Sequence, residues 1–165
     1  ESGVLWIFPE GQNLLPLLQD VAAAFGPKAR EKGIELDVRF PRGEVLCRYD
    51  RKWTAEALGN IVDNAIKDAP AGSRVGVSAR EFEFYVCVQV KDQGTGIPEE
   101  QSARIFGRFC RGKGMQQEEG IGIGLYLAQE ILERQDGYIK VSSREGEGRC
   151  LGIYLPRDEE NLSKV

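Results

Sequence analysis

The stretch "GIGIGLYLAQEIL", residues 120–132, places glycine at Gly120, Gly122 and Gly124 and runs directly into an amphipathic segment. A glycine turn that leads into a helix suits an anion, because unpaired backbone N–H groups and the helix dipole both point towards it. The dinucleotide fingerprint needs G-x-G-x-x-G directly after a strand, whereas the spacing here is G-x-G-x-G after a loop. The other common phosphate loop, G-x-x-x-x-G-K-[ST], has no match in the chain. Residues 120–124 therefore predict an anion site of another kind, which the surrounding sequence must identify.

Helical and strand-like patterns alternate on both sides of this stretch. Helices are expected at residues 13–32, 51–68 and about 122–135, the first of them ended by Gly33. Strands are expected at residues 34–40, 44–50, 138–143 and 149–156, and in the two halves of 74–92, which turn near Glu81. Hairpins mixed with helices predict an α+β fold. We expect a two-layer α/β sandwich, a mixed and mostly antiparallel sheet with about three helices on one face.

The segments between and beyond these elements are of two kinds. Residues 93–119 are rich in glycine and lack sustained periodicity, so we expect a loop region with a short turn of helix near 99–106. Residues 157–165 are charged and are expected to form a frayed tail. The length suits one domain over residues 1–165. Because the chain does not open with methionine, we expect it to be a processed product or a piece of a longer protein, and we favour the piece.

The composition excludes several classes of protein. With 41% hydrophobic and 29% charged residues the chain is typical of a soluble domain, and a net charge of −4 argues against a nucleic-acid binder. It contains no histidine, which excludes imidazole catalysis, histidine metal sites and a serine–histidine–aspartate triad. No apolar run is long enough to span a bilayer. The cysteines are far apart and have no metal-ligand spacing, which favours reduced cytosolic thiols.

The segment "EALGNIVDNAIKDA", residues 56–69, carries polar residues in an unusual place. Glu56, Asn60, Asn64 and Lys67 are spaced by four, four and three residues, so they line one face of the expected helix. Asparagine is a mediocre helix former, and its amide oxygen is a hard ligand suited to Mg²⁺, which keeps waters and takes few protein groups. A lysine one turn further can reach a phosphate. An ordinary solvated helix face explains the same pattern.

Two more segments concentrate candidate binding groups. In "VQVKDQGTGIP", residues 88–98, a hydrophobic strand ends in Asp92, whose carboxylate can accept a hydrogen bond from a base amino group, and glycines allow close backbone packing. An ordinary turn is the alternative. In "RIFGRFCRGKG", residues 104–114, basic residues cluster within an acidic protein, which fits neutralisation of a polyphosphate. Phe106 and Phe109, three residues apart, are more typical of a core anchor.

These four segments, in this order, resemble the catalytic ATP-binding domain of sensor histidine kinases. That family shares its fold, the Bergerat fold, with DNA gyrase, the Hsp90 chaperones and the MutL mismatch-repair proteins. "NIVDNAIK" is similar to the family's N box, "DQGTGI" to its G1 box, "IFGRF" to its F box and "GIGIGL" to its G2 box. The resemblance covers about residues 10–156, and four ordered boxes are far more specific than any one of them.

The resemblance implies ATP and Mg²⁺ as cofactors and assigns roles on the expected helix and strand. Asn64 would bind Mg²⁺, with Asn60 assisting directly or through water. Lys67 would contact phosphate. Asp92 would accept a hydrogen bond from the adenine amino group.

Further roles follow for the glycine-rich half of the chain. Arg108 and Arg111 would lie near the terminal phosphate, and residues 97–119 would form the ATP lid. The other residues expected to line the nucleotide site are Gly94, Gly96, Ile97, Phe106, Gly120, Gly122, Ile123, Gly124 and Leu125.

The residue at position 60 bears on which group accepts the phosphoryl group. The gyrase and chaperone relatives carry a glutamate base where this chain has Asn60. Water or serine must lose a proton to attack phosphorus, whereas a neutral imidazole already has a free lone pair. Asn60 therefore favours transfer of the γ-phosphoryl group to a histidine, although Glu56, one turn earlier, is placed to assist as a base.

The resemblance also implies partners. The phosphoacceptor histidine would lie on a separate dimerisation domain of the full-length protein, and a response regulator would receive the phosphoryl group. The isolated domain is expected to be a monomer, from the cytoplasmic side of a bacterial membrane-anchored sensor. A serine kinase of the anti-sigma-factor type, and a module that binds nucleotide or docks partners without catalysis, remain alternatives.

Overall fold

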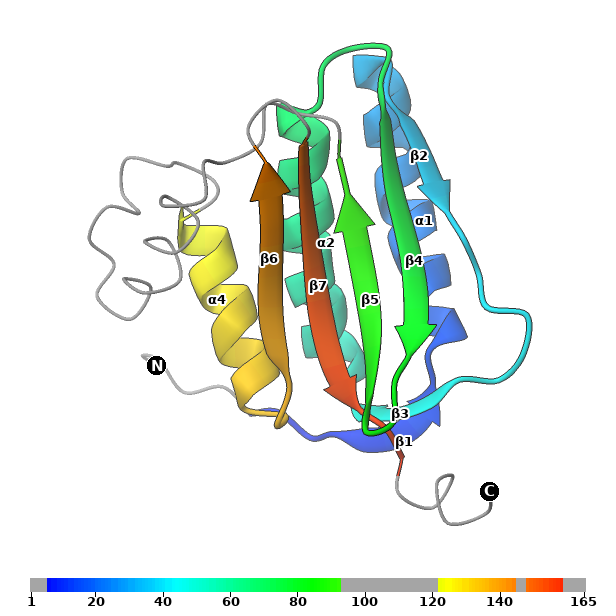
Figure 1. The fold of residues 1–165 in the computed structure, drawn as a ribbon, viewed down its shortest axis with the longest axis vertical. Coiled ribbons are helices and arrows are strands. Elements are labelled where there is room, and N and C mark those ends of the chain that lie inside the picture. Colours follow the sequence, from blue (N-terminus) through cyan, green and yellow to red (C-terminus); the bar gives the residue numbers. More distant parts are fainter. Residues whose placement is uncertain (1–5, 93–121, 145–147, 159–165) are drawn as a thin grey trace.

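The computed structural model of the chain describes residues 6–92, 122–144 and 148–158. In chain order its elements are β1 (Glu10–Asn13), α1 (Leu15–Lys32), β2 (Glu35–Val38), β3 (Leu46–Tyr49), α2 (Arg51–Asp68), β4 (Arg74–Glu81), β5 (Tyr85–Lys91), α4 (Gly122–Glu133), β6 (Tyr138–Arg144) and β7 (Gly148–Pro156). In Figure 1 the helices α1, α2 and α4 all lie behind one face of a sheet, with α2 between the other two. The predicted two-layer α+β arrangement is confirmed.

The main sheet has five strands in the order β2-β4-β5-β7-β6. β2 runs parallel to β4, and every other neighbouring pair is antiparallel, so the sheet is mixed and mostly antiparallel as expected. β5 and β7 are central neighbours, and their register places Lys91 opposite Cys150 at one end and Tyr85 opposite Pro156 at the other. The two halves of residues 74–92 and the two strands of 138–156 form the expected hairpins.

Local sequence signals explain where the two long helices end. Gly33 has a φ of +80°, and its N–H donates to the Arg30 carbonyl oxygen at 3.0 Å, which closes α1 with a left-handed glycine. Asp50 precedes α2 in an extended conformation, and its carboxylate accepts a hydrogen bond from the Trp53 backbone N–H at 3.1 Å. α2 spans the predicted residues 51–68 and stops two residues before Pro70.

The hydrophobic core fills the space between the helices and the sheet. Its largest fully buried side chains come from α1 and the residue before it, from α2, α4 and β7, and from β3 with Tyr49; they include Leu14, Leu17, Leu18, Leu58, Ile61, Val62, Ile131, Leu132, Ile153 and Leu155. Alternate residues of β4, Val75 and Val77, point into it. None of the described helices combines the length and the apolar character that a membrane span needs.

One feature differs from the expected single sheet. β1 and β3 form a separate two-stranded antiparallel sheet, with Gln12 opposite Cys47. β1 was not expected, because its four residues, EGQN, show no alternation of apolar and polar side chains. Strands 34–40 and 44–50 were both expected, but they belong to different sheets: β2 pairs with β4 and β3 pairs with β1. The first helix begins at Leu15 rather than 13, because Asn13 ends β1 and its side chain accepts from the Leu15 N–H.

Candidate functional site

Four polar residues lie along one side of α2, as their spacing predicts. Asn60 and Asn64 are half-buried, one turn apart, and Glu56 and Lys67 are exposed at either end of the row. The rest of the helix is held firmly, because α2 lies between α1 and α4 and against the sheet (Figure 1). Its buried residues are Thr54, Ala57, Leu58, Gly59, Ile61, Val62, Ala65 and Ile66. The two amides are therefore carried by a rigid element.

The Lys67 ammonium group, expected near phosphate, lies beside a carboxylate of its own helix. Its Nζ is 3.4 Å from Asp63 Oδ2, and Lys28 of α1 donates a hydrogen bond to Asp63 Oδ1 at 2.9 Å. Burial raises the pKa of the Asp63 carboxyl, but the hydrogen bond and charge of Lys28 together with Lys67 outweigh it. The net effect is a pKa below the ordinary 3.8. Asp63 therefore stays ionised between two lysines and links α1 to α2.

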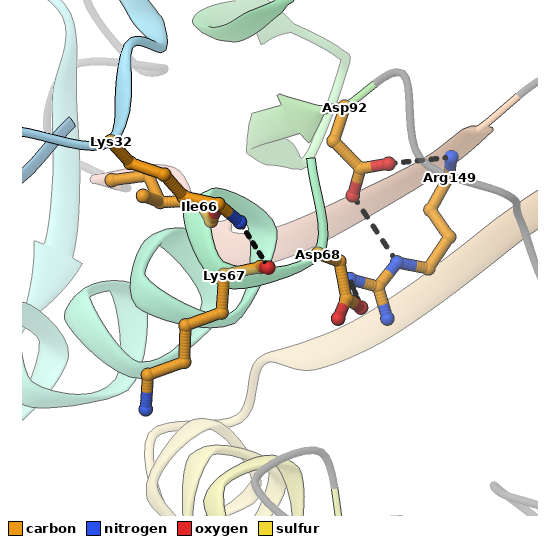
Figure 2. Close-up of polar contacts among 6 residues, drawn as sticks. All are labelled: Lys32, Ile66, Lys67, Asp68, Asp92 and Arg149. Atoms are coloured by element: carbon orange, nitrogen blue, oxygen red, sulfur yellow. Dashed lines mark hydrogen bonds and ion pairs between the residues drawn. The ribbon is translucent and has the colours of Figure 1, made fainter. Parts of the chain in front are cut away.

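The C-terminal end of α2 is capped by a lysine from the neighbouring helix. Lys32, the last residue of α1, donates from its Nζ to the backbone carbonyl oxygens of Ile66, at 2.8 Å, and of Lys67 (Figure 2). A positive charge at these carbonyls complements the negative end of the helix dipole. This cap fixes the end of α2 that carries Asn64 and Lys67.

Asp92, at the end of β5, is the most completely buried of the candidate carboxylates. Its side chain is 1% exposed, and that of Arg149, at the start of β7, is 4% exposed. The Arg149 backbone N–H donates to Asp92 Oδ1 at 3.2 Å, and Arg149 Nε donates to Asp92 Oδ2 at 3.2 Å. Arg149 Nη2 donates in turn to Oδ2 of Asp68, the last residue of α2, at 2.6 Å. Figure 2 shows the guanidinium group lying between the two carboxylates.

Sequence reasoning missed Arg149 and Asp68. Arg149 opens a strand of otherwise apolar and aromatic residues, where an exposed charge is ordinary, and Asp68 follows Lys67 at a helix end where solvated charges are common. Arg149 is separated from Asp92 by 57 residues and from Asp68 by 81. The sheet order places β7 beside β5, and the end of α2 lies next to Arg149, so only the tertiary structure brings the three charges together.

Gly122 and Gly124 lie at the expected helix start. α4 begins at Gly122, so Gly122, Ile123 and Gly124 belong to its first turn, where backbone N–H groups have no partner within the helix. Leu125 is buried in the core. α4 and β7 begin, and α2 and β5 end, towards the same end of the molecule (Figure 1). That end therefore holds the last turn of α2, the end of β5 with Asp92, and the N-terminus of α4.

Several expected site residues lie outside the described parts of the chain. They are Gly94, Gly96, Ile97, Phe106, Arg108, Arg111 and Gly120, together with the proposed lid, residues 97–119. Their roles stay predictions from the sequence.

The described residues fit a magnesium ion that would take most of its ligands from water and phosphate rather than from the protein. Within residues 6–92, 122–144 and 148–158, no three His, Cys, Asp or Glu side chains gather as a metal cluster. Asn60 and Asn64 supply neutral amide oxygens from one face of α2. Such a donor set suits Mg²⁺ that keeps waters and phosphate oxygens as its remaining ligands, and it does not suit zinc.

Comparison with known proteins identifies the family to which this chain belongs. Residues 49–159 match the family described as histidine kinase-, DNA gyrase B-, and HSP90-like ATPase. The chain is 35% identical over 144 residues to the adaptive-response sensory kinase SasA of Rippkaea orientalis, covering 86% of this chain and 37% of that protein. It is 31% identical over 135 residues to the sensor histidine kinase WalK of Bacillus subtilis, covering 79% of this chain and 22% of WalK. The chain thus spans well under half the length of these relatives.

Solved structures show the same fold. The catalytic domain of the histidine kinase ThkA is 25% identical and superposes with a TM-score of 0.76, over 93% of this chain and 98% of that one. Full-length ShkA in complex with AMPPNP is 26% identical with a TM-score of 0.73, over 96% of this chain and 33% of ShkA.

Proposed function

Because the chain belongs to the family of histidine kinase-, DNA gyrase B- and HSP90-like ATPases, we propose that it binds Mg·ATP and donates the γ-phosphoryl group to a histidine. That histidine lies outside these 165 residues, which contain none. The relatives described above are sensor kinases, and they favour the histidine acceptor. The observation that carries the proposal is the buried Asp92 carboxylate at the end of β5, beside the end of the helix that bears Asn60 and Asn64.

In this proposal Asp92 recognises the base. Its carboxylate accepts a hydrogen bond from the adenine amino group, an interaction that guanine, with an oxygen at that position, does not make. A hydrogen bond to a buried charged group contributes about 1.5–3 kcal/mol. Asp92 thus sets the preference of the site for adenine nucleotides.

In this proposal α2 carries the residues that contact the phosphates and their metal ion. Asn64, with Asn60 assisting, would hold Mg²⁺, which when bound neutralises part of the charge of the triphosphate. Lys67 would contact a phosphate. Its present ion pair with Asp63, at 3.4 Å and with the lysine side chain 62% exposed, is a weak surface interaction that a phosphate can displace. Catalysis would then consist mainly of positioning and charge neutralisation.

The remaining site residues are proposed from the sequence alone. Arg108 and Arg111 would neutralise the terminal phosphate. Glycine N–H groups at the start of α4, from Gly122 and Gly124, would face the phosphates, because a helix N-terminus attracts anions. Gly94, Gly96, Ile97, Phe106, Gly120, Ile123 and Leu125 would complete the lining.

Asn60 favours a histidine as the acceptor residue. A histidine needs no base to attack phosphorus, so an amide at this position of α2 is compatible with transfer to imidazole. Glu56, exposed one turn earlier, is the residue placed to act as a base if one is used. We propose as partners a dimerisation domain with the phosphoacceptor histidine and a response regulator, within a longer sensor protein.

The test has two stages. Calorimetry should show that the chain binds ATP more tightly with Mg²⁺ than with a chelator, and absence of ATP binding would contradict the proposal. In the full-length protein, γ-labelled ATP should give acid-labile, base-stable label, and Asn64→Ala should abolish it. Acid-stable label would point instead to a serine kinase. ATP binding without any label would point to a module without catalysis.

A further inference from the structure

A group of three charges, two of them buried, lies where α2 and β5 end and β7 begins. Arg149 is 4% exposed and bridges Asp92, 1% exposed, and Asp68, 47% exposed. Burying a guanidinium group is costly unless it is paired and hydrogen-bonded, and Arg149 meets that requirement with two carboxylates. Two of the charges lie on elements assigned above to nucleotide binding: Asp92 follows β5, and Asp68 is the last residue of α2.

The contacts from Arg149 fix how the Asp92 carboxylate is oriented. One residue supplies a donor to each of its oxygens, the backbone N–H to Oδ1 and Nε to Oδ2. The backbone between them is also held, because the Asp92 N–H donates to the Arg149 carbonyl oxygen at 2.9 Å. Rotation of the carboxylate about its side-chain bonds would break at least one of these contacts.

The outer contact, between Arg149 and Asp68, links the orientation of the Asp92 carboxylate to α2. Arg149 Nη2 lies 2.6 Å from Asp68 Oδ2, so the guanidinium plane is anchored at both ends. Asp68 lies one turn beyond Asn64 on the same helix. A carboxylate has about four acceptor positions, so Asp92 can accept from Arg149 and from a further donor at the same time.

We propose that Arg149 is a positioning residue for base recognition: it holds the Asp92 carboxylate ready for the exocyclic amino group of adenine. This inference rests on the proposed function, in which Asp92 reads the base. A preorganised acceptor binds more tightly than one that must first be ordered. A purely structural ion pair and a pair that competes with the base are the two alternatives, and they predict different measurements.

The experiment compares two nucleotides on this chain by calorimetry: ATP and purine riboside triphosphate, which lacks the amino group. The wild type should bind ATP roughly ten- to a hundredfold more tightly, the equivalent of a hydrogen bond to a buried charge. Asp92→Ala, which removes the acceptor, should reduce this ratio to near one. Arg149→Met should reduce it by roughly three- to tenfold, and the double variant should lose no more than Asp92→Ala alone.

Arg157→Met is the matched control. Arg157 lies just beyond the other end of β7, where its side chain is 17% exposed and paired with Glu81 at 3.3 Å. Replacing it also removes an arginine ion pair next to β7, but at the end opposite to Asp92, so the nucleotide ratio should stay at the wild-type value while the melting temperature falls.

Each outcome of this comparison supports or overturns the positioning role of Arg149. If Arg149→Met lowers the melting temperature and leaves the ratio unchanged, the ion pair is structural and the inference is wrong. If that variant binds ATP more tightly, Arg149 competes with the base, which also overturns it. Should Arg149→Met fail to fold, Asp68→Asn loosens only the outer contact and should still lower the ratio; an unchanged ratio there refutes the proposal. A wild type that binds neither nucleotide would instead refute the proposed function, and this inference with it.

Discussion

At the scale of single residues, the two amides of α2 have two interpretations: they belong to a metal site, or they lie on a solvated helix face. Asn60 and Asn64 are half-buried on a helix whose other residues form much of the core. Both interpretations fit their spacing. They differ in what happens when nucleotide and metal are added together.

We predict that Asn64→Ala removes the Mg²⁺-dependent part of stabilisation by ATP. ATP at about a hundred times its dissociation constant adds roughly 2.7 kcal/mol to the free energy of unfolding. A domain of this size gains roughly 2–4 °C in melting temperature per kcal/mol. Thermal melts with ATP, with Mg²⁺ or with a chelator, measure this shift.

Its controls lie on the same helix. The melting temperature of Asn64→Ala without ligand serves as that variant's own baseline, so that only the shift caused by ATP with Mg²⁺ or with a chelator is compared. Asn60→Ala should lose a smaller part of the Mg²⁺ effect. If both variants keep the full effect, α2 is only a scaffold and the metal ligand lies elsewhere.

At the scale of elements, α2 is held at both ends by residues distant in sequence. Lys32 of α1 caps its carbonyl end, and Asp50 caps its N-terminus. The Asp50 carboxylate also accepts from the Phe8 backbone N–H at 2.8 Å, and the Asp50 N–H donates to Gln135 Oε1 at 2.5 Å. Asp50 therefore joins the N-terminal segment, α2 and the turn after α4.

We predict that Asp50→Ala lowers the free energy of unfolding by about 1–2 kcal/mol, because the cap on Trp53 N–H is lost. The melting temperature should fall by roughly 2–8 °C. Asp50→Asn keeps an acceptor oxygen at the cap and should lose clearly less. Equal losses for the two variants would show that the charge, rather than the cap, stabilises α2.

The junction of α1 and α2 has its own pH dependence. The pKa of Asp63 is lowered in the folded chain, so its ion pairs stabilise the fold above the ordinary carboxyl pKa of 3.8. That contribution is lost as the pH falls through the folded-state value. We predict that Asp63→Asn destabilises the domain at neutral pH and that the difference from wild type shrinks in acid below pH 3.8.

Urea midpoints across this pH range measure the effect. Glu35→Gln is the control, since Glu35 pairs with Arg74 at 3.3 Å with both side chains more than half exposed, and such pairs contribute little. If the difference in urea midpoint between wild type and Asp63→Asn stays constant below pH 3.8, the ion pairs of Asp63 are not the source of the stabilisation.

At the scale of the whole molecule, this chain carries the residues that we propose for nucleotide binding but no imidazole that could accept a phosphoryl group, because it contains no histidine. We predict that the 165-residue chain binds ATP and takes up no acid-labile, base-stable label from γ-labelled ATP. Phosphoramidate analysis after incubation measures this. Stoichiometric label of that kind on the chain would overturn the histidine-acceptor assignment.

Sequence patterns were sufficient wherever the physical signal is local. The periodicity of apolar residues defined α1 and α2, Gly33 marked a helix end, and alternating strands marked both hairpins. The i, i+4 spacing placed Asn60 and Asn64 on one face of a helix, as the structure has them. These features depend on neighbouring residues and on fixed helical or strand geometry, so a single chain contains the information.

Tertiary structure alone decided the pairings between distant segments. β1 has no apolar alternation and exists because β3 supplies its hydrogen bonds. Arg149 meets Asp92 and Asp68 only because β7 enters the sheet beside β5 and the end of α2 lies over that junction. Propensity and periodicity act over a few residues, whereas the contacts of a buried charge are set by which elements pack together. The sequence therefore determined the fold class and the row of amides, and the three-dimensional packing decided what surrounds the carboxylate that we assign to the base.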